Sequence, residues 1–208
     1  MPDVAPILPP RPDGFKGSLA GPSPWYPHPV HGEAIFLRAR PMTDAADPER
    51  ATLSALDRLG VPYEVIPCDP EFADTAAFCE RYGYPPDHAG NTILVVSKKE
   101  PRQYAACVVT APTRLDVNHA VRRLLGASKV SFASAEEMAR LTGMLVGGAT
   151  VFGLPDGVPV FVDARVMALD YVILGTGGRT GKIRVSPEVF RRLPNSRVVP
   201  DLALQRAP

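Results

Sequence analysis

Proline is distributed very unevenly along this chain of 208 residues, and the distribution limits where a packed domain can form. Eleven of the 24 prolines fall within the first 48 residues. Proline fixes φ and removes a backbone donor, so a dense cluster disfavours helices and central strands. We therefore expect a proline-rich N-terminal extension over residues 1–48 and a single domain over residues 49–208, a span near the usual size for one hydrophobic core.

The overall composition is that of a globular protein, with 45% hydrophobic and 22% charged residues. No apolar run approaches the roughly 18 residues of a membrane helix, and the N-terminus lacks the basic start and long apolar stretch of a secretory signal. The net charge of +1 excludes a strongly basic nucleic-acid coat but not a local basic patch. The three cysteines form no CxxC pair. We expect buried free thiols in a cytoplasmic protein that contacts no membrane.

Hydrophobic periodicity and capping residues predict helices and strands that alternate irregularly along the domain. The helices are expected at 49–59, 74–82, 117–125, 134–141 and 187–193, and the strands at 62–67, 92–97, 104–110, 129–132, 158–162, 171–174 and 182–185. A short polar segment joins the runs 92–97 and 104–110, which predicts a hairpin. Hairpins exclude a purely parallel doubly wound sheet. The expected fold class is α/β, with a mixed, largely antiparallel sheet and flanking helices.

Glycine is concentrated where proline is sparse, because nine of the 17 glycines lie between Gly143 and Gly181. Most of them form a glycine loop over residues 142–155 and a second cluster over residues 175–182. Glycine lets a backbone approach a ligand closely and aim several N–H groups at one oxygen, although ordinary turns use it too. The cluster over residues 175–182 has GxGxxxG rather than GxGxxG spacing and precedes a strand, so we expect a glycine-rich hairpin and not a dinucleotide loop. The four histidines lack metal-ligand spacing, so we expect no metal site. No GxSxG motif occurs, which disfavours a serine hydrolase.

Basic side chains form three groups along the sequence, and each is either a solvated surface or part of a phosphate-binding patch. If the groups converge on the glycine-rich segments, they would suit contacts to the phosphates of an RNA end. The candidate RNA-binding residues are Lys98, Arg122, Arg179 and Lys182.

Five short motifs occur in a fixed order between residues 52 and 193 and together point to a known family. They are Leu115-Asp116-Val117, the run from Leu141-Thr142-Gly143 to Gly153-Leu154-Pro155, Val160-Phe161-Val162-Asp163, Gly177-Gly178, and Ser186-Pro187. This order resembles the YbaK/EbsC/ProX-type domain. That family comprises free-standing editing deacylases for aminoacyl-tRNA and the related insertion domain of bacterial prolyl-tRNA synthetases.

The resemblance implies hydrolysis of the ester between a wrong amino acid and the 3′ end of tRNA, without a metal or a cofactor. In this family, backbone amides of the glycine loop hold the substrate carbonyl, as in other sites that stabilise an oxyanion. The implied catalytic positions are Asn91, Gly147, Gly148, Ala149 and Thr150. The implied substrate-binding positions are Thr142, Met144, Val151, Phe152, Gly153 and Asp163. Asp163 could hold a substrate amine or cap the turn after its strand. The implied partners are the aminoacylated 3′ end of tRNA and an aminoacyl-tRNA synthetase.

Two departures from the family pattern leave the function open between three hypotheses. Asn91 stands where the family has a lysine, and Val151 stands where its loop has a proline. Asparagine can hydrogen-bond a carbonyl or ribose hydroxyl but carries no charge. The chain is therefore an active editing deacylase or a non-catalytic module that binds aminoacyl-tRNA, an amino acid or a nucleotide. The third hypothesis is a scaffold whose proline-rich extension binds a partner.

Overall fold

The described part of the chain begins just before the first helix. The structure is a computed structural model that describes residues 47–205. The first helix, α1, spans Pro48–Leu59, and the Asp47 side chain caps it by accepting the Glu49 N–H. Apart from its last two residues, the predicted extension over residues 1–48 lies outside the described residues, so the division at residue 48 stays a prediction.

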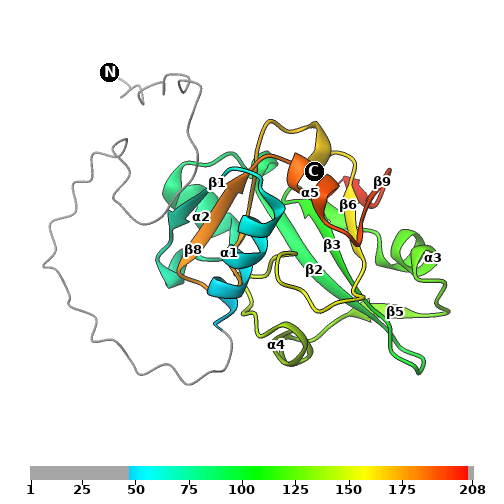
Figure 1. Ribbon diagram of the computed structural model, residues 1–208. Coiled ribbons are helices and arrows are strands. Elements are labelled where there is room, and N and C mark those ends of the chain that lie inside the picture. The colour runs from blue at the N-terminus through cyan, green and yellow to red at the C-terminus, as the bar shows by residue number, and fades with distance from the viewer. Residues whose placement is uncertain (1–46, 206–208) are drawn as a thin grey trace, which may run out of the picture. The chain divides into compact units, whose positions relative to one another are not determined.

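A mixed sheet of five strands in the order β5-β2-β3-β6-β9 forms the larger part of the fold (Figure 1). The strands are β2 (Gly90–Ser97), β3 (Tyr104–Thr110), β5 (Val130–Phe132), β6 (Val160–Asp163) and β9 (Ser196–Val199). The predicted hairpin of β2 and β3 is confirmed, and β5 also pairs antiparallel with β2. β6 pairs parallel with both β3 and β9, so the sheet is mixed as predicted.

A second, antiparallel sheet of three strands stands next to the first. Its order is β1-β8-β7, with β1 at Tyr63–Pro67, β7 at Val172–Gly175 and β8 at Gly181–Val185. The hairpin of β7 and β8 contains the second glycine cluster, which confirms a glycine-rich hairpin there. The two sheets meet at a parallel bridge between Ala89 and Ile173. A small pair of strands, β4 (Thr113–Leu115) and β10 (Ala203–Gln205), completes the strands of residues 47–205.

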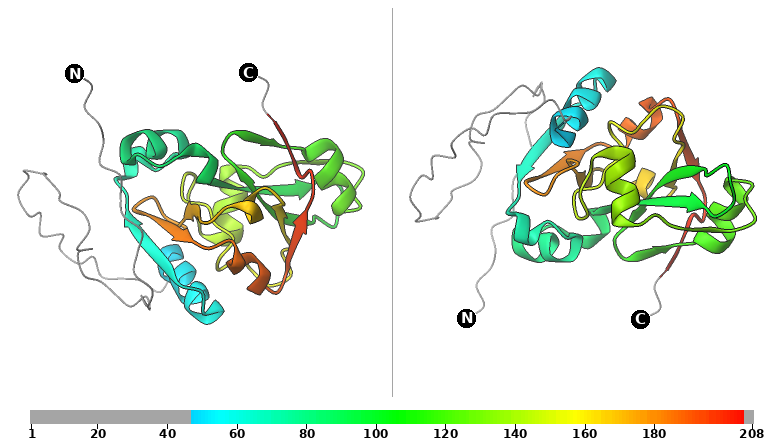
Figure 2. Two further views of the ribbon diagram at one scale, coloured as in Figure 1. Left: turned by 90° about the horizontal axis from the view of Figure 1, so that it is seen from above. Right: turned by 90° about the horizontal axis from the view of Figure 1, so that it is seen from below.

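The helices after α1 are α2 (Thr75–Tyr82), α3 (Arg122–Leu124), α4 (Ala135–Thr142) and α5 (Glu188–Arg192), with short turns η1 (Pro70–Phe72), η2 (Pro86–His88), η3 (Val117–Val121) and η4 (Val166–Ala168). Glycines end α1 and α2 as predicted, and also α4, but the Asp74 side chain makes no capping hydrogen bond at the start of α2. Ser134 and Glu137 form the predicted capping box of α4. The expected helix at 117–125 is divided into the π-helical turn η3 and the short α3, with Asp116 as the cap. Figure 2 shows α1 running beside β1 and β8.

The central strands are buried on both faces, which explains why their sequences read as continuous apolar runs. Leu94 and Val108 face a core shared with α1 and the three-stranded sheet. Val95 and Val109 face a second core with η3 on the other side. All three cysteines are free and buried, as expected. No helix within residues 47–205 is long and apolar enough to cross a membrane.

Candidate functional site

A pocket of about 160 Å³ lies where the two sheets meet. Its walls come from the first residues of β2, the start of α2, the loop before β6, and strands β7 and β8. The lining residues are Asp74, Thr75, Phe78, Ala89, Gly90, Asn91, Thr92, Gly147, Ala149, Ile173, Leu174, Gly175 and Lys182. The pocket thus brings together three of the five predicted catalytic positions, which are Asn91, Gly147 and Ala149.

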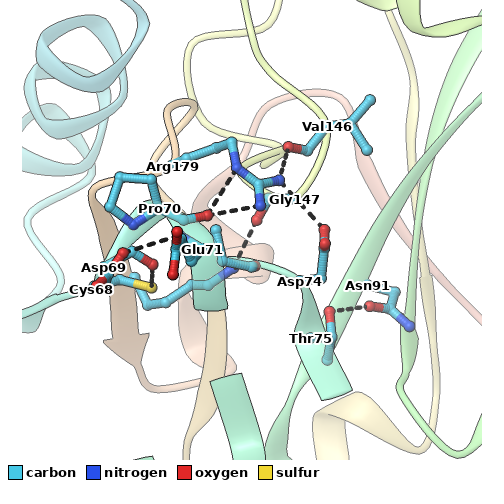
Figure 3. A network of polar contacts seen from close by, with 12 residues as sticks. Cys68, Asp69, Pro70, Glu71, Asp74, Thr75, Asn91, Val146, Gly147 and Arg179 are labelled. Carbon is cyan, nitrogen blue, oxygen red and sulfur yellow. Dashed lines mark hydrogen bonds and ion pairs between the residues drawn. The ribbon is translucent and has the colours of Figure 1, made fainter. Parts of the chain in front are cut away.

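Asn91 is held in the pocket wall by α2. Thr75 Oγ1 at the start of that helix donates to Asn91 Oδ1 at 2.7 Å (Figure 3). An asparagine amide has one oxygen acceptor and two N–H donors. The oxygen is therefore occupied, and the amide nitrogen of Asn91 has no partner among the residues that the structure describes. Asn91 can offer N–H donors to a ligand in the pocket.

The backbone amides of the glycine loop are not equivalent. The Gly148 N–H donates to the Leu145 carbonyl at 3.0 Å, so a turn already uses it. Neither the Gly147 N–H nor the Ala149 N–H donates to any group within residues 47–205. Both of these residues line the pocket, and Gly148 does not. The amides of Gly147 and Ala149 are consequently the two that can bind a carbonyl oxygen, and Gly148 has a different role.

That role is to let the two glycine clusters touch through their backbones. The Gly148 carbonyl accepts the Gly177 N–H at 2.7 Å, and the Gly177 carbonyl accepts the Leu145 N–H at 2.9 Å. A Cβ on Gly148 would lie 1.6 Å from the Gly178 carbonyl oxygen. A Cβ on Gly175 would lie 2.0 Å from the Gly148 carbonyl oxygen. Only glycine permits this approach.

A side chain of the first helix fixes the cluster over residues 175–182. Glu49 of α1 accepts from Thr176 Oγ1 at 2.9 Å and from Thr180 Oγ1 at 2.7 Å. These bonds hold the turn between β7 and β8 against the first helix. The turn that contacts the glycine loop is therefore held by a residue far away in the sequence.

Arg179 ties the glycine loop to the segment before α2. Its guanidinium donates to the Pro70 carbonyl at 2.7 Å, to the Val146 carbonyl at 2.8 Å and to the Asp74 carboxylate at 3.3 Å (Figure 3). The side chain is 28% exposed, beside the pocket-lining Asp74. An RNA contact by Arg179 stays a prediction, and the structure shows that this residue also positions the glycine loop.

Lys182 lies in a different environment from the one expected. The sequence suggested a surface contact to RNA phosphate, but the residue is only 5% exposed and lines the pocket. Its Nζ donates to the Ala73 carbonyl at 2.5 Å and to the Gly147 carbonyl at 2.6 Å. Burial lowers the pKa of this ammonium group. We therefore reassign Lys182 from an RNA surface to the pocket wall.

Lys98 and Arg122 are exposed and lie away from the pocket. Lys98 follows the far end of β2, seven residues from Asn91, and a strand advances roughly 3.3 Å per residue, so the two are about 23 Å apart along the strand. Arg122 begins α3. The three basic groups therefore do not converge on one site, and RNA contacts at these two positions stay predictions.

Several predicted substrate-binding residues, and the predicted catalytic residue Thr150, do not line the pocket. Val151 and Phe152 are buried in the core shared with α1. Met144 and Thr150 are also buried, and the Thr150 hydroxyl has no partner within the described residues. Thr142 Oγ1 donates back to a carbonyl within α4. The exposed Gly153 forms a turn with φ of 76°.

The sequence left two roles open for Asp163, and the structure shows that it caps the turn after its strand. It is 1% exposed, at the end of β6. Its carboxylate accepts the Arg165 N–H at 2.9 Å and the Ala203 N–H at 2.8 Å, and it pairs with the Arg165 guanidinium. It therefore caps the turn after its strand and anchors β10. It does not line the pocket.

The family of the chain follows from its match to a known domain model. The model of the aminoacyl-tRNA editing domain matches residues 69–193, which include every residue of the pocket. The chain belongs to the aminoacyl-tRNA editing domain family. The membership covers more than half of the chain and agrees with the resemblance found in the sequence.

Solved structures show the same fold. One is described as a "putative trans-editing enzyme for prolyl tRNA synthetase" and has 20% sequence identity and a TM-score of 0.65. That alignment covers 78% of this chain and 99% of the other. A hypothetical protein with 23% identity and a TM-score of 0.65 aligns over 73% of this chain and 98% of its own length. The expected fold class, including its likeness to YbaK-type editing domains, is confirmed.

Proposed function

We propose that this protein is a trans-editing hydrolase that removes a wrong amino acid from the 3′ end of a tRNA. The observation that carries this proposal is the shared pocket of Asn91, Gly147 and Ala149, in which unused N–H donors from a strand and a loop face one space. Membership of the editing domain family supports an aminoacyl-tRNA as the ligand.

The glycine loop would stabilise the transition state. As water attacks the ester, negative charge develops on the carbonyl oxygen. The amides of Gly147 and Ala149 can donate to that oxygen and form an oxyanion hole. Removal of one such donor from an enzyme costs about 3 kcal/mol of transition-state stabilisation, so the pair can supply a substantial part of the catalysis without a side-chain nucleophile.

Asn91 would orient the scissile ester. With its oxygen held by Thr75, its amide N–H groups can donate to the ester carbonyl or to a ribose hydroxyl. The water oxygen forms a bond to the carbonyl carbon, and the bond from that carbon to the ribose oxygen then breaks. The ribose oxygen takes up a proton, assisted by the neighbouring terminal hydroxyl of the tRNA. The products are a free amino acid and an uncharged tRNA.

The apolar part of the pocket would receive the amino-acid side chain. Phe78, Ala89 and Ile173 form this part, and they belong to a cluster packed around α2. A space of about 160 Å³ in total has little room beyond the ester and a small side chain. We propose that small aliphatic amino acids are preferred over aromatic ones.

Deacylation of a panel of mischarged tRNAs tests the proposal. We expect turnover above spontaneous hydrolysis for at least one tRNA that carries a small amino acid, and a loss of at least tenfold in Asn91→Ala. Asn118 is exposed in η3 and does not line the pocket. Asn118→Ala makes the same change outside the pocket and is the matched control. If the protein binds aminoacyl-tRNA but hydrolyses none of the panel, the non-catalytic hypothesis replaces this one.

A further inference from the structure

Lys182 of β8 lines the same pocket, and the hydrogen bonding of its ammonium group is incomplete. A lysine ammonium has three N–H donors. Two are used by the carbonyls of Ala73 and Gly147, and the third has no partner within residues 47–205. Gly175 is the cross-strand neighbour of Lys182 and also lines the pocket, so no side chain at that position covers the ammonium group.

The charge of Lys182 is also uncompensated. No carboxylate of the described residues lies within ion-pair distance of its Nζ, and the nearby Asp74 carboxylate is paired with Arg179. The ring of Phe78 lies 5.6 Å from Nζ and contributes only a weak cation–π attraction. Buried charges are ordinarily paired, because an isolated one is costly to remove from water. A buried cation with a free donor in a pocket is thus suited to a ligand oxygen that carries or develops negative charge.

A purely structural role is the alternative, because the two carbonyl bonds join the start of α2 to the glycine loop. That role alone does not explain why the group reaches the pocket. Gly147 both accepts a bond from Lys182 through its carbonyl and lines the pocket with its own amide. The ammonium group is therefore beside one of the two amides proposed to bind the ester carbonyl.

We propose that Lys182 is a catalytic residue whose third N–H donates to an oxygen of the aminoacyl ester and supplies the positive charge of the site. The inference rests on the proposed function. The contact forms with the bound ester and strengthens as negative charge develops during water attack, so its loss should weaken binding and lower kcat further. No covalent bond to Lys182 is formed or broken.

Substitution of Lys182 by methionine keeps the length of the side chain and removes the charge. With the tRNA that responds in the panel, we expect Lys182→Met to lower kcat/KM at least 100-fold, through both KM and kcat, as for other groups that stabilise an oxyanion. Lys99→Met makes the same change at an exposed position and should leave kcat/KM within twofold. Thermal melts identify variants that are folded at the assay temperature. If folded Lys182→Met keeps wild-type kcat/KM, the proposal is overturned.

A pair of double variants separates the charge from the structural bonds. Asn91→Lys/Lys182→Met returns an ammonium group to the pocket from β2 but does not restore the bonds to Ala73 and Gly147. Asn91→Met/Lys182→Met is its uncharged match. We expect the lysine version to be at least tenfold more active. Equal activity of the two folded double variants would mean that the bonds of Lys182 matter and its charge does not, which overturns the proposal.

Binding of a non-hydrolysable probe keeps this inference distinguishable from the proposed function. The probe is 3′-aminoacylamino-3′-deoxyadenosine, which has an amide in place of the ester and carries a small aliphatic amino acid. If the wild type hydrolyses no tRNA, deacylation fails as the function. A tenfold weaker Kd for the probe in Lys182→Met would then still support Lys182 as a ligand donor, and an unchanged Kd would overturn it.

Discussion

The contact between the two glycine clusters makes Gly148→Ala a sharp test of the site. The new Cβ would lie 1.6 Å from the Gly178 carbonyl oxygen, whereas ordinary van der Waals contact begins near 3.4 Å. The obstacle is backbone, so one loop must move by well over an ångström. That movement breaks the 2.7 Å bond from the Gly177 N–H to the Gly148 carbonyl. It also displaces the amides of Gly147 and Ala149 from the pocket.

The loss of stability in Gly148→Ala follows from the overpacking and from the broken hydrogen bond. Overpacking against a rigid neighbour costs about 1–3 kcal/mol, and the lost hydrogen bond adds about 1 kcal/mol. The free energy of unfolding should therefore fall by about 2–4 kcal/mol, which corresponds to a Tm lower by about 6–12 °C for a domain of this size. Urea titration measures the first quantity and calorimetry the second. Deacylation measured well below the Tm should fall at least 100-fold, because a misplaced oxyanion hole loses its effect.

Gly181→Ala is the matched control, since Gly181 is also in the hairpin and its Cβ would come closest to the Thr176 methyl group, at 3.0 Å, with the other neighbouring atoms at 3.5 Å or more. It should cost less than about 1.5 kcal/mol, because a side chain can move where a backbone cannot. If Gly148→Ala and Gly181→Ala have equal stability, the backbone contact between the two glycine clusters is not the reason for glycine at position 148, and the reasoning is refuted.

Three further predictions concern charges. Glu49→Gln weakens charge-assisted bonds to the β7–β8 turn and should lower the free energy of unfolding by about 1–2 kcal/mol in urea titration; no change would contradict the support assigned to Glu49. Asp163→Asn leaves a buried donor facing the Ala203 N–H and should cost about 2–4 kcal/mol. The kcat/KM of Asp163→Asn, measured below its Tm, should equal that of the wild type. A tenfold loss would instead indicate that Asp163 takes part in substrate binding. Burial lowers the pKa of Lys182, so between that pKa and its ordinary value of about 10.4 the unfolded chain binds more protons. The stability of the wild type relative to that of Lys182→Met should therefore rise with pH in this interval, and parallel curves from urea titrations across the alkaline range would refute this.

Local sequence signals predicted most of the fold because they act over short distances. The capping box at Ser134 and the glycine after α1 act within one turn of helix and fixed element ends closely. Strands β4, β9 and β10 were not predicted. Each has only three or four residues, and each pairs with a strand distant in the sequence.

The site was predicted only in part, because some of its contacts join residues that are distant in the sequence. The resemblance placed Asn91 beside the glycine loop, and the pocket unites them. It could not distinguish a glycine that lines the pocket from Gly148, whose need for glycine comes from a contact with Gly178 in the other cluster. Lys182 was expected at the surface because most lysines are exposed. Alternation along β8 offered the one available signal, since Ile183 and Val185 fill the core and Lys182 must face the other side.

The backbone contact between the glycine clusters also bears on how such a pocket can evolve. The oxyanion-binding part of the pocket consists of main-chain groups of the glycine loop, which are common to all amino acids and are altered by substitution only through a change of shape. The part proposed to receive the amino-acid side chain consists of side chains on other segments, such as Phe78 on α2 and Ile173 on β7. Substitutions there can change which amino acid fits and leave the oxyanion-binding part intact. Selectivity and reactivity are thus encoded in separate segments, and a descendant of this protein could acquire a new substrate without rebuilding its reactive centre.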